Sequence, residues 1–315
     1  MRKQKFSEFM AQLKDLPEEQ RAALHELLGK TRHERNPAAV IDTQFAKAPI
    51  CPRCQSGSMH KFGVVSGIQR YRCKDCGRSF NALTGTSMAR LRKKELWLEY
   101  SKALADNLSL SKAAERCGID RTTAFRWRHR FLQTSGQSKV CCSGITEVDE
   151  TYFLESFKGK KVSHRKPRKR GKEVRVRGLS AEQIPVVVAR DREGHTCDAV
   201  LRTRTAKEVG IHIGSYISPA SVLCIEQSRI LIKFAKDSGL AFEAIGTKQR
   251  RGREKVFHVQ NVNAYHSRLK NWMVRFHGVA TERLSNYLGW RRLHELALRA
   301  PEDWLRTAVK HKINN

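Results

Sequence analysis

Two cysteine pairs in the first third of the chain constrain its fold more than any other feature. The pairs are CPRC and CKDC, separated by residues 55–72, and their members are Cys51, Cys54, Cys73 and Cys76. This spacing is typical of a tetrahedral zinc site with four thiolate ligands, in which each pair occupies a tight turn. Gly77 follows the second pair and permits such a turn. We therefore predict one structural zinc ion, bound by these four cysteines.

The residues between the cysteine pairs read as two short strands. Gly63–Val65 and Gln69–Arg72 flank a Ser66-Gly67 turn, which is the pattern of a zinc ribbon. A redox-active dithiol pair or a coincidence of spacing is the alternative. The chain has nine cysteines, and an odd number fits a reducing compartment better than a disulfide framework.

The net charge of the chain points to a polyanionic partner. Lys and Arg number 61 against 31 Asp and Glu, which gives +30 at pH 7. Double-stranded DNA is the first candidate for such a partner, and a membrane surface is the rival. No apolar run approaches the roughly 18 residues of a membrane span, and the first residues lack a secretory apolar segment. We expect a cytoplasmic, nucleoid-associated protein with no membrane partner.

Residues 90–135 read as a helix-turn-helix. Gly118 would make the turn between two helices, and Asp120 would cap the second helix. Its packing residues would be Phe125, Trp127 and Phe131. The residues expected on its leading face, where base edges would be read, are Arg121, Thr122, Thr123 and Arg126. An ordinary helical hairpin is the alternative interpretation.

A strand at residues 145–160 carries acidic side chains among apolar ones. It contains Glu147, Asp149 and Glu150, and a buried carboxylate is costly unless a cation meets it. The cation could be an Arg side chain, or a divalent metal such as Mg²⁺, which prefers carboxylate oxygens. The strand runs into Lys158–Arg177, which holds eleven Lys or Arg, and Arg168, Lys169 and Arg170 are its candidate phosphate contacts.

The rest of the second half alternates strands and helices. Ile184–Ala189 is a continuous apolar strand, 195–201 is its hairpin partner, and a third apolar strand at 221–225 ends at Glu226. Helices are expected at 205–217, 228–236 and 258–278. The chain is thus predicted to be a multidomain α/β protein: a helical N-terminus (1–45), a zinc ribbon (46–85), the helix-turn-helix (90–135), a mixed α/β domain (144–292) and a helical tail (293–315).

Several motifs, in this order, resemble those of bacterial insertion-sequence transposases. More narrowly, they resemble the zinc-ribbon family numbered fifteen-ninety-five, with its DDE-type domain. The motifs are CPRC…CKDCGRSFNALTGT, ITEVDETYF, VLCIEQ, VNAYHSRLKNW and GVATERLSNYLGW. They span roughly residues 48–292.

The resemblance implies a ribonuclease-H-like catalytic domain with four site residues. A catalytic acid stands on the first strand, here Asp149, and a second acid follows the fourth strand, here Glu226. The family then has Asn or Glu on a late helix, here Asn263, and a Lys one heptad on, here Lys270. Mg²⁺ held by the two acids would support DNA cleavage and strand transfer. The implied partners are terminal inverted repeats, target DNA and further copies of the chain, in a homodimer or a larger synaptic oligomer.

The chain departs from the family pattern at the second acid. The family has Asp there, and this sequence has Glu226 followed by Gln227. The carboxylate is one methylene further from the backbone, which predicts reduced activity because such sites depend on sub-ångström geometry. The alternative is a DNA-binding protein without catalysis, either a regulator or a decayed transposase. A zinc-ribbon protein acting on RNA is a third interpretation, but the aromatic pattern of single-strand readers is missing.

Overall fold

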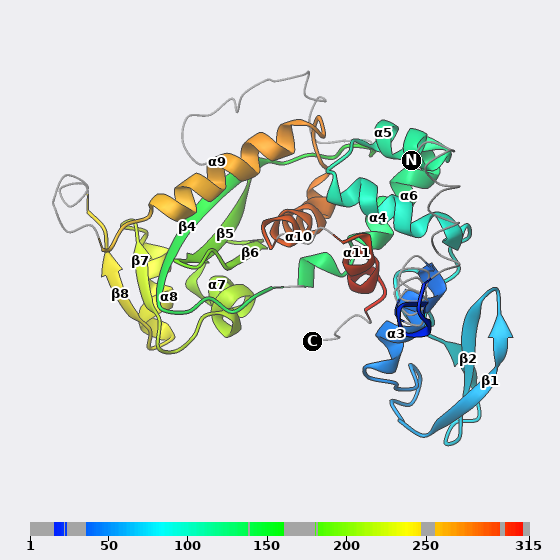
Figure 1. Cartoon of the computed structure of the whole chain (residues 1–315). Helices are drawn as coiled ribbons and strands as arrows, with labels where there is room; N and C mark the ends of the chain where they lie inside the picture. Colours follow the sequence, from blue (N-terminus) through cyan, green and yellow to red (C-terminus); the bar gives the residue numbers. More distant parts are fainter. Residues whose placement is uncertain are drawn as a thin grey trace. The chain divides into compact units, whose positions relative to one another are not determined.

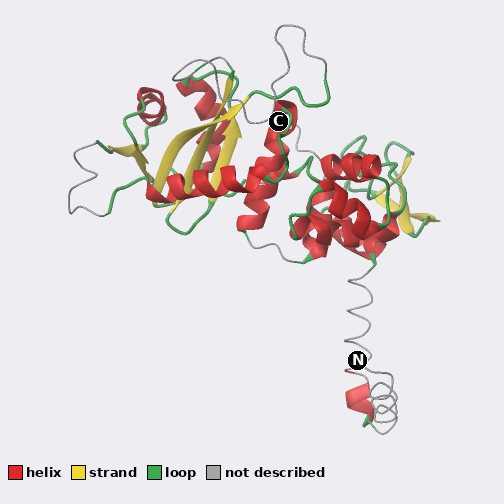
Figure 2. Cartoon of the chain, turned by 90° about the horizontal axis from the view of Figure 1, so that it is seen from above, coloured by secondary structure: helices red, strands yellow, loops and turns green. Residues whose placement is uncertain are grey.

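The computed structural model of the chain describes residues 16–21, 23, 36–137, 139–160, 180, 182–246, 256–296 and 300–310 (Figures 1 and 2). The chain divides into two compact units. The first comprises residues 1–107, 113–119 and 300–312, and the second comprises residues 108–112, 120–299 and 313–315. Most of the predicted helical segment at 1–45 lies outside the described residues.

The first unit contains a three-stranded antiparallel sheet that a helix covers on one face. Its strands, in order, are β1 (Met59–Val65), β2 (Ile68–Cys73) and β3 (Ser79–Asn81). Tyr71 pairs with Phe80 across the sheet, and Phe45 of helix α3 (Pro37–Ala46) packs on both rings, with centroids 4.9 and 6.1 Å away. Because alternate residues of a strand point to opposite faces, α3 covers the face that carries Tyr71 and Phe80.

Helices from both ends of the chain complete the first unit. Helix α4 (Trp97–Ala105) packs against α11 (Pro301–Ala308), which also contacts α3. Helix α5 (Leu110–Cys117) buries Ala113, Ala114 and Cys117. The C-terminal helix α11 therefore belongs to the same compact unit as the first part of the chain.

Helix α6 (Arg121–Phe131) belongs to the second unit and has the cap that the sequence predicts. Asp120 Oδ1 accepts a hydrogen bond from the backbone N–H of Thr122 at 2.7 Å. Trp127 and Phe131 are buried, as expected, but Phe125 is 45% exposed, so its predicted packing role is wrong. The buried stripe of α6 runs through Ala124, Trp127 and Phe131, and Phe125 lies off this stripe.

The second unit is built on a five-stranded mixed sheet. Its strands are β4 (Ile145–Leu154), β5 (Gln183–Asp191), β6 (Thr196–Val200), β7 (Val222–Ile225) and β8 (Ala241–Ala244). Their order is β6-β5-β4-β7-β8; β5 is antiparallel to its two neighbours, while β4, β7 and β8 run parallel. This arrangement agrees with the ribonuclease-H-like domain that the resemblance implies. The sequence does not predict strand β8, because the strand has only four residues and they are mostly exposed.

Helices cover both faces of this sheet (Figure 2). On one face, α7 (Ala206–Ile213) and α8 (Arg229–Asp237) share an apolar core with Val148, Val187 and Ile225. On the other face, α9 (Gln260–Val274) contacts β4 and β5, and α10 (Leu284–Glu295) contacts β6. Figure 1 shows α9 running beside β4. No helix in the described part of the chain is long and apolar enough to cross a membrane.

A buried ion pair between Asp198 of β6 and Arg292 of α10 is connected to the turn after α6. Asp198 of β6 accepts hydrogen bonds from Tyr265 Oη, at 2.9 Å, and from Arg292. Arg292 also donates to the carbonyls of Ser135 and Gly136, at 3.1 and 3.0 Å. Burial lowers the pKa of Arg292 to about 10, which leaves the guanidinium charged at neutral pH. Its donors are thus matched by a carboxylate and two carbonyls inside the fold.

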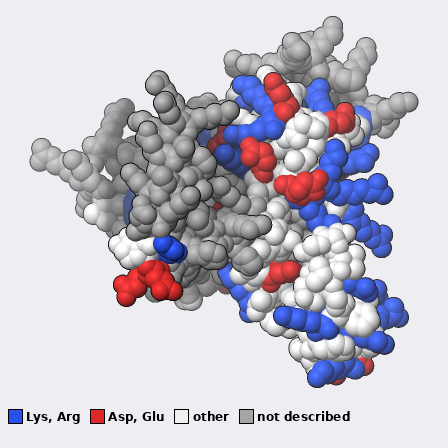
Figure 3. All heavy atoms as spheres, turned by 45° about the vertical axis from the view of Figure 1, so that its right-hand side comes forward, with Lys and Arg blue, Asp and Glu red and all other residues white. Residues whose placement is uncertain are grey.

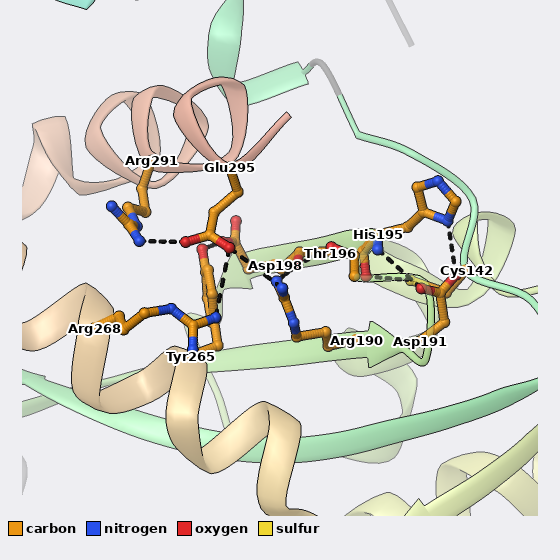
Figure 4. A network of polar contacts seen from close by, with 11 residues as sticks. Cys142, Arg190, Asp191, His195, Thr196, Asp198, Tyr265, Arg268, Arg291 and Glu295 are labelled. Carbon is orange, nitrogen blue, oxygen red and sulfur yellow. Dashed lines mark hydrogen bonds and ion pairs between the residues drawn. The ribbon is translucent and has the colours of Figure 1, made fainter. Parts of the chain in front are cut away.

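A second polar cluster lies at the end of α10. Glu295 accepts hydrogen bonds from Arg190 of β5 at 3.2 Å, from Arg268 of α9 at 3.5 Å, and from Arg291 (Figure 4). Burial alone would raise the pKa of Glu295, but the three cations together lower it. This cluster therefore ties both covering helices to the sheet.

Candidate active site

Two acidic residues lie on, or directly after, adjacent parallel strands. Val148 of β4 is opposite Ile225, the last residue of β7, so Asp149 is the next residue of β4 and Glu226 is the first residue after β7. Val148 and Ile225 point into the core beneath α7 and α8. Since side chains alternate along a strand, Asp149 is directed to the opposite face, where α9 lies. The register thus places the two predicted acids at the same level of neighbouring strands.

Helix α9 turns a polar stripe toward Asp149. Asn263, His266 and Lys270 are spaced by three and four residues and share one side of the helix. His266 is buried, and its Nδ1 lies 3.8 Å from Asp149 Oδ2. Asn263 and Lys270 are exposed. The Nε2 atom of His266 has no hydrogen-bond partner among the described residues.

The surroundings of Asp149 disfavour its charged form. Burial raises its pKa, and the neighbouring Glu150 raises it further, while the backbone hydrogen bond from Glu150 and the charge of Lys270 lower it. Burial, together with Lys270, lowers the pKa of His266 to about 4, so this side chain is neutral at pH 7. Asp149 is thus a half-buried carboxylate that a nearby cation would stabilise.

Glu147 positions helix α9, a role that the sequence does not reveal. It is fully buried, and its Oε2 accepts a hydrogen bond at 2.8 Å from the backbone N–H of Val262, in the first turn of α9. Its Oε1 is paired with Arg192 and lies 3.2 Å from His258 Nδ1. Arg192 in turn donates to the carbonyl of Val256 at 2.7 Å. The start of α9 is therefore fixed to the strand two residues before Asp149.

The Asp149 carboxylate has the chemistry of a ligand for a divalent metal of the Mg²⁺ type. Its oxygens are the atoms that such ions prefer, and a cation would stabilise the charge that burial disfavours. Among the described residues, the only His, Cys, Asp and Glu group with three or more ligand atoms in mutual reach is the cysteine cluster. The predicted acids therefore do not form a compact ligand set by themselves.

The four predicted cysteines do form a compact set. Their Sγ atoms all lie within 4.8 Å of one another. Cys51 Sγ lies 3.7 Å from Cys76 Sγ, and Cys54 Sγ lies 3.5 Å from Cys73 Sγ. Four sulfurs at about 2.3 Å from one zinc ion would be roughly 3.8 Å apart, so the spacing fits. The glycine predicted for the second turn, Gly77, has φ 68°, in the left-handed region.

Backbone hydrogen bonds favour thiolates at two of the four cysteines. Burial raises the pKa of the Cys51 thiol, but hydrogen bonds from the backbone N–H groups of Cys54 and Arg53 lower it to about 7. The backbone N–H of Cys76 is the main cause of a lowered pKa at Cys73. At Cys54 the backbone N–H of Ser56 lowers the pKa, but burial and hydrogen bonds with the other three thiols raise it to about 12. A metal-binding thiol must be deprotonated, so a bound cation would have to stabilise the Cys54 thiolate.

The predicted DNA-reading residues of α6 reach solvent. Arg121, Thr122 and Arg126 are exposed and Thr123 is half-buried. Lys158, at the end of the described part of the basic segment, donates to the carbonyls of Phe276, His277 and Gly278 at 3.3, 3.0 and 2.9 Å. Arg168, Lys169 and Arg170 lie outside the described residues.

Comparisons with known proteins agree on the kind of protein. Residues 142–291 match the ISXO2-like transposase domain family, and residues 89–140 match a homeodomain-like domain. The chain is 27% identical over 277 residues to an uncharacterized protein in the transposable element ISH50 of Halobacterium salinarum. That alignment covers 85% of this chain and 92% of the relative.

Two solved structures were also found. One is a Mos1 transposase paired-end complex with the left transposon end, with 13% identity, a TM-score of 0.26, and coverage of 66% of this chain and 76% of that one. The other is a pre-cleavage Mos1 transpososome, with 12% identity, a TM-score of 0.21, and coverage of 68% and 79%. Likeness at these scores is too low to carry an argument about this chain.

Proposed function

We propose that the chain is an insertion-sequence transposase, as the match of residues 142–291 to the ISXO2-like transposase domain family indicates, and that it binds the terminal repeats of its own element and cuts and joins DNA there. The observation that supports this proposal is the register of β4 and β7, in which Val148 lies opposite Ile225, so that Asp149 and Glu226 are the next residues along neighbouring parts of the chain. The test is an in vitro cleavage and strand-transfer assay with the ends of the element and Mg²⁺.

The proposed reaction is phosphoryl transfer without a covalent protein intermediate. Water attacks a phosphorus atom at the element's end, and the element's 3′-oxygen leaves as its P–O bond breaks and takes up a proton. The freed 3′-hydroxyl then loses its proton, attacks a phosphorus atom of the target, and displaces the target's own 3′-oxygen. Asp149 and Glu226 would hold Mg²⁺, which when bound activates the nucleophile and stabilises the leaving oxygen. Asn263 would offer an amide oxygen to the same ions, and Lys270 would contact a phosphate near the cut. Glu147 would keep these α9 residues facing Asp149.

We also propose that residues 46–85 form a zinc ribbon with a structural Zn²⁺ on Cys51, Cys54, Cys73 and Cys76. The sulfur spacing and the lowered pKa of Cys51 support this assignment. In the same scheme, residues 90–135 form the DNA-binding region, 144–292 the catalytic domain and 293–315 the tail. Synapsis of two element ends would require a homodimer or a larger assembly.

We expect one zinc ion per chain in protein purified from metal-replete cells. Cys73→Ser should lower the zinc content to near zero, because it removes a thiolate from the centre of the cluster. Cys141→Ser is the matched control, since Cys141 is an exposed cysteine outside the cluster. Metal analysis of the three proteins decides the question, and wild-type protein without zinc would exclude the ribbon.

DNA binding by α6 should depend on base contacts. We expect the double variant Arg121→Ala/Arg126→Ala to lower affinity for the element's ends by about 1–3 kcal/mol for each lost base contact, and to reduce the preference for those ends over unrelated DNA. Lys236→Ala is the control, because it removes an exposed cation from α8. Fluorescence anisotropy with the two kinds of DNA measures both quantities. A preference equal to that of wild type would contradict the proposed role of α6.

A non-catalytic DNA-binding protein is the second candidate function. The observation in its favour is Glu226, whose carboxylate stands one methylene further from the backbone than the family's Asp. The absence of a compact acidic ligand set among the described residues points the same way. The two candidates differ only in cleavage, so the assay above separates them while DNA binding is common to both.

A further inference from the structure

The open face of the three-stranded sheet in the first unit carries an aromatic ring between two arginines. Alternation directs Arg70 and Arg72 of β2 away from the face that α3 covers. The guanidinium carbons of Arg70 and Arg72 lie 5.4 and 5.5 Å from the centre of the Phe62 ring, which is 42% exposed. His60 lies at the edge of the same ring, with centroids 6.3 Å apart.

Both guanidinium groups are held in place by hydrogen bonds to uncharged groups. Arg70 Nη2 donates to Ser79 Oγ at 2.9 Å, and Arg72 Nε donates to the carbonyl of Gly77 at 3.1 Å. In the described part of the chain, neither group is paired with a carboxylate. The positive charge of each is therefore oriented by the sheet but not neutralised by it.

The geometry of the face suits a phosphate backbone. Residues two apart on a strand are roughly 6.6 Å apart, since the rise is about 3.3 Å per residue, and this is comparable with the spacing of successive phosphates along one DNA strand. Further cations, Lys61 and Arg78, are exposed on the same sheet module. On the face drawn in Figure 3, Lys and Arg side chains outnumber acidic ones along one side of the described surface.

We propose that Phe62, Arg70 and Arg72 form a second DNA-contact site, separate from α6, which takes the phosphates and sugars of double-stranded DNA. The two guanidinium groups bind successive phosphates of one strand. The Phe62 ring keeps the guanidinium groups apart and parallel to the face, and offers its exposed part to the sugars between the phosphates. This site rests on the proposed function only in its choice of DNA as the partner, because it requires no cleavage.

The test compares three variants of the full chain by anisotropy with duplex DNA from the element's ends. We expect Arg70→Gln/Arg72→Gln to weaken binding about tenfold or more at moderate salt and to reduce the salt slope by about 2. Phe62→Ala should weaken binding severalfold with a smaller change in slope. Val64→Ala should bind like wild type, because Val64 is an exposed side chain of β1, the strand of Phe62, and is not part of the proposed site.

Zinc content and oligomeric state are measured on every variant. A double variant that keeps its zinc and binds DNA with wild-type affinity and slope overturns the proposal. So does a double variant whose oligomeric state changes while its DNA affinity is retained, since the face would then contact another protein. If the ribbon variants lose DNA affinity and the wild-type chain never cuts DNA, the contact site stands and the proposed catalysis fails. If only the α6 variants lose DNA affinity, the second contact site is excluded, and the cleavage assay decides the proposed catalysis separately.

Discussion

In a cleavage assay with Mg²⁺ and the ends of the element, we expect Asp149→Ala to cut no detectable DNA and Glu226→Asp to cut faster than the wild-type chain. Loss of the Asp149 carboxylate should cost roughly 10³-fold or more, as removal of one electrostatic stabiliser does in other enzymes. Glu226→Asp restores the shorter side chain beside Asp149, and a gain of about tenfold would correspond to about 1.4 kcal/mol of barrier.

The controls separate catalysis from folding and binding. Asp149→Asn keeps the shape of the side chain, and its melting temperature should not fall, because burial already disfavours the Asp149 carboxylate. Asp237→Asn removes an exposed acid at the end of α8 and should cut like wild type. If Asp149→Ala cuts DNA as well as wild type, the active site is elsewhere. If neither wild type nor Glu226→Asp cuts while both bind, the chain is a DNA-binding protein without catalysis.

The largest expected effect on stability comes from Arg292. We expect Arg292→Met to lower the free energy of unfolding of the second unit by roughly 3–5 kcal/mol, because Asp198 would stay buried without its cation. Arg268→Met should cost less than about 1 kcal/mol, since the Arg268 side chain is 44% exposed and its contact with Glu295 is long. Urea denaturation followed by circular dichroism gives both values.

A double variant makes this prediction sharper. Asp198→Asn keeps an acceptor for Tyr265 Oη while removing the buried charge, so Asp198→Asn/Arg292→Met should recover part of the stability lost in Arg292→Met. Equal losses for Arg292→Met and Arg268→Met would show that the buried pair contributes no more than an exposed one.

Local features of the fold could be predicted from the sequence. The cysteine spacing predicts the two turns whose sulfurs converge, and the apolar run Ile184–Ala189 predicts the central part of strand β5. Asp120 predicts the start of α6, because a cap depends on the residues that follow it directly. Motifs predict the acids Asp149 and Glu226, and the register of β4 and β7 pairs the residues that precede them, Val148 and Ile225.

Long-range features could not be predicted in this way. The Asp198–Arg292 pair joins residues 94 positions apart, and the packing of α11 in the first unit joins the two ends of the chain. Neither leaves a periodic signal in the sequence. The role of Glu147 was missed for the same reason, since its partner is a backbone N–H on a distant helix. Its one signal is an acid two residues before Asp149 in an apolar strand.

Glu147 and Asp149 lie two residues apart on β4 and have different surroundings. Glu147 is bonded into the fold, whereas the raised pKa of Asp149 shows that burial works against its charge. We therefore expect mutations that inactivate the chain at Asp149 to leave its folding and its proposed DNA contacts in place. A copy of the element that has lost its chemistry would still make a protein that occupies the element's ends. Such a protein would compete with active copies for the element's ends and would therefore act as a dominant-negative inhibitor of transposition.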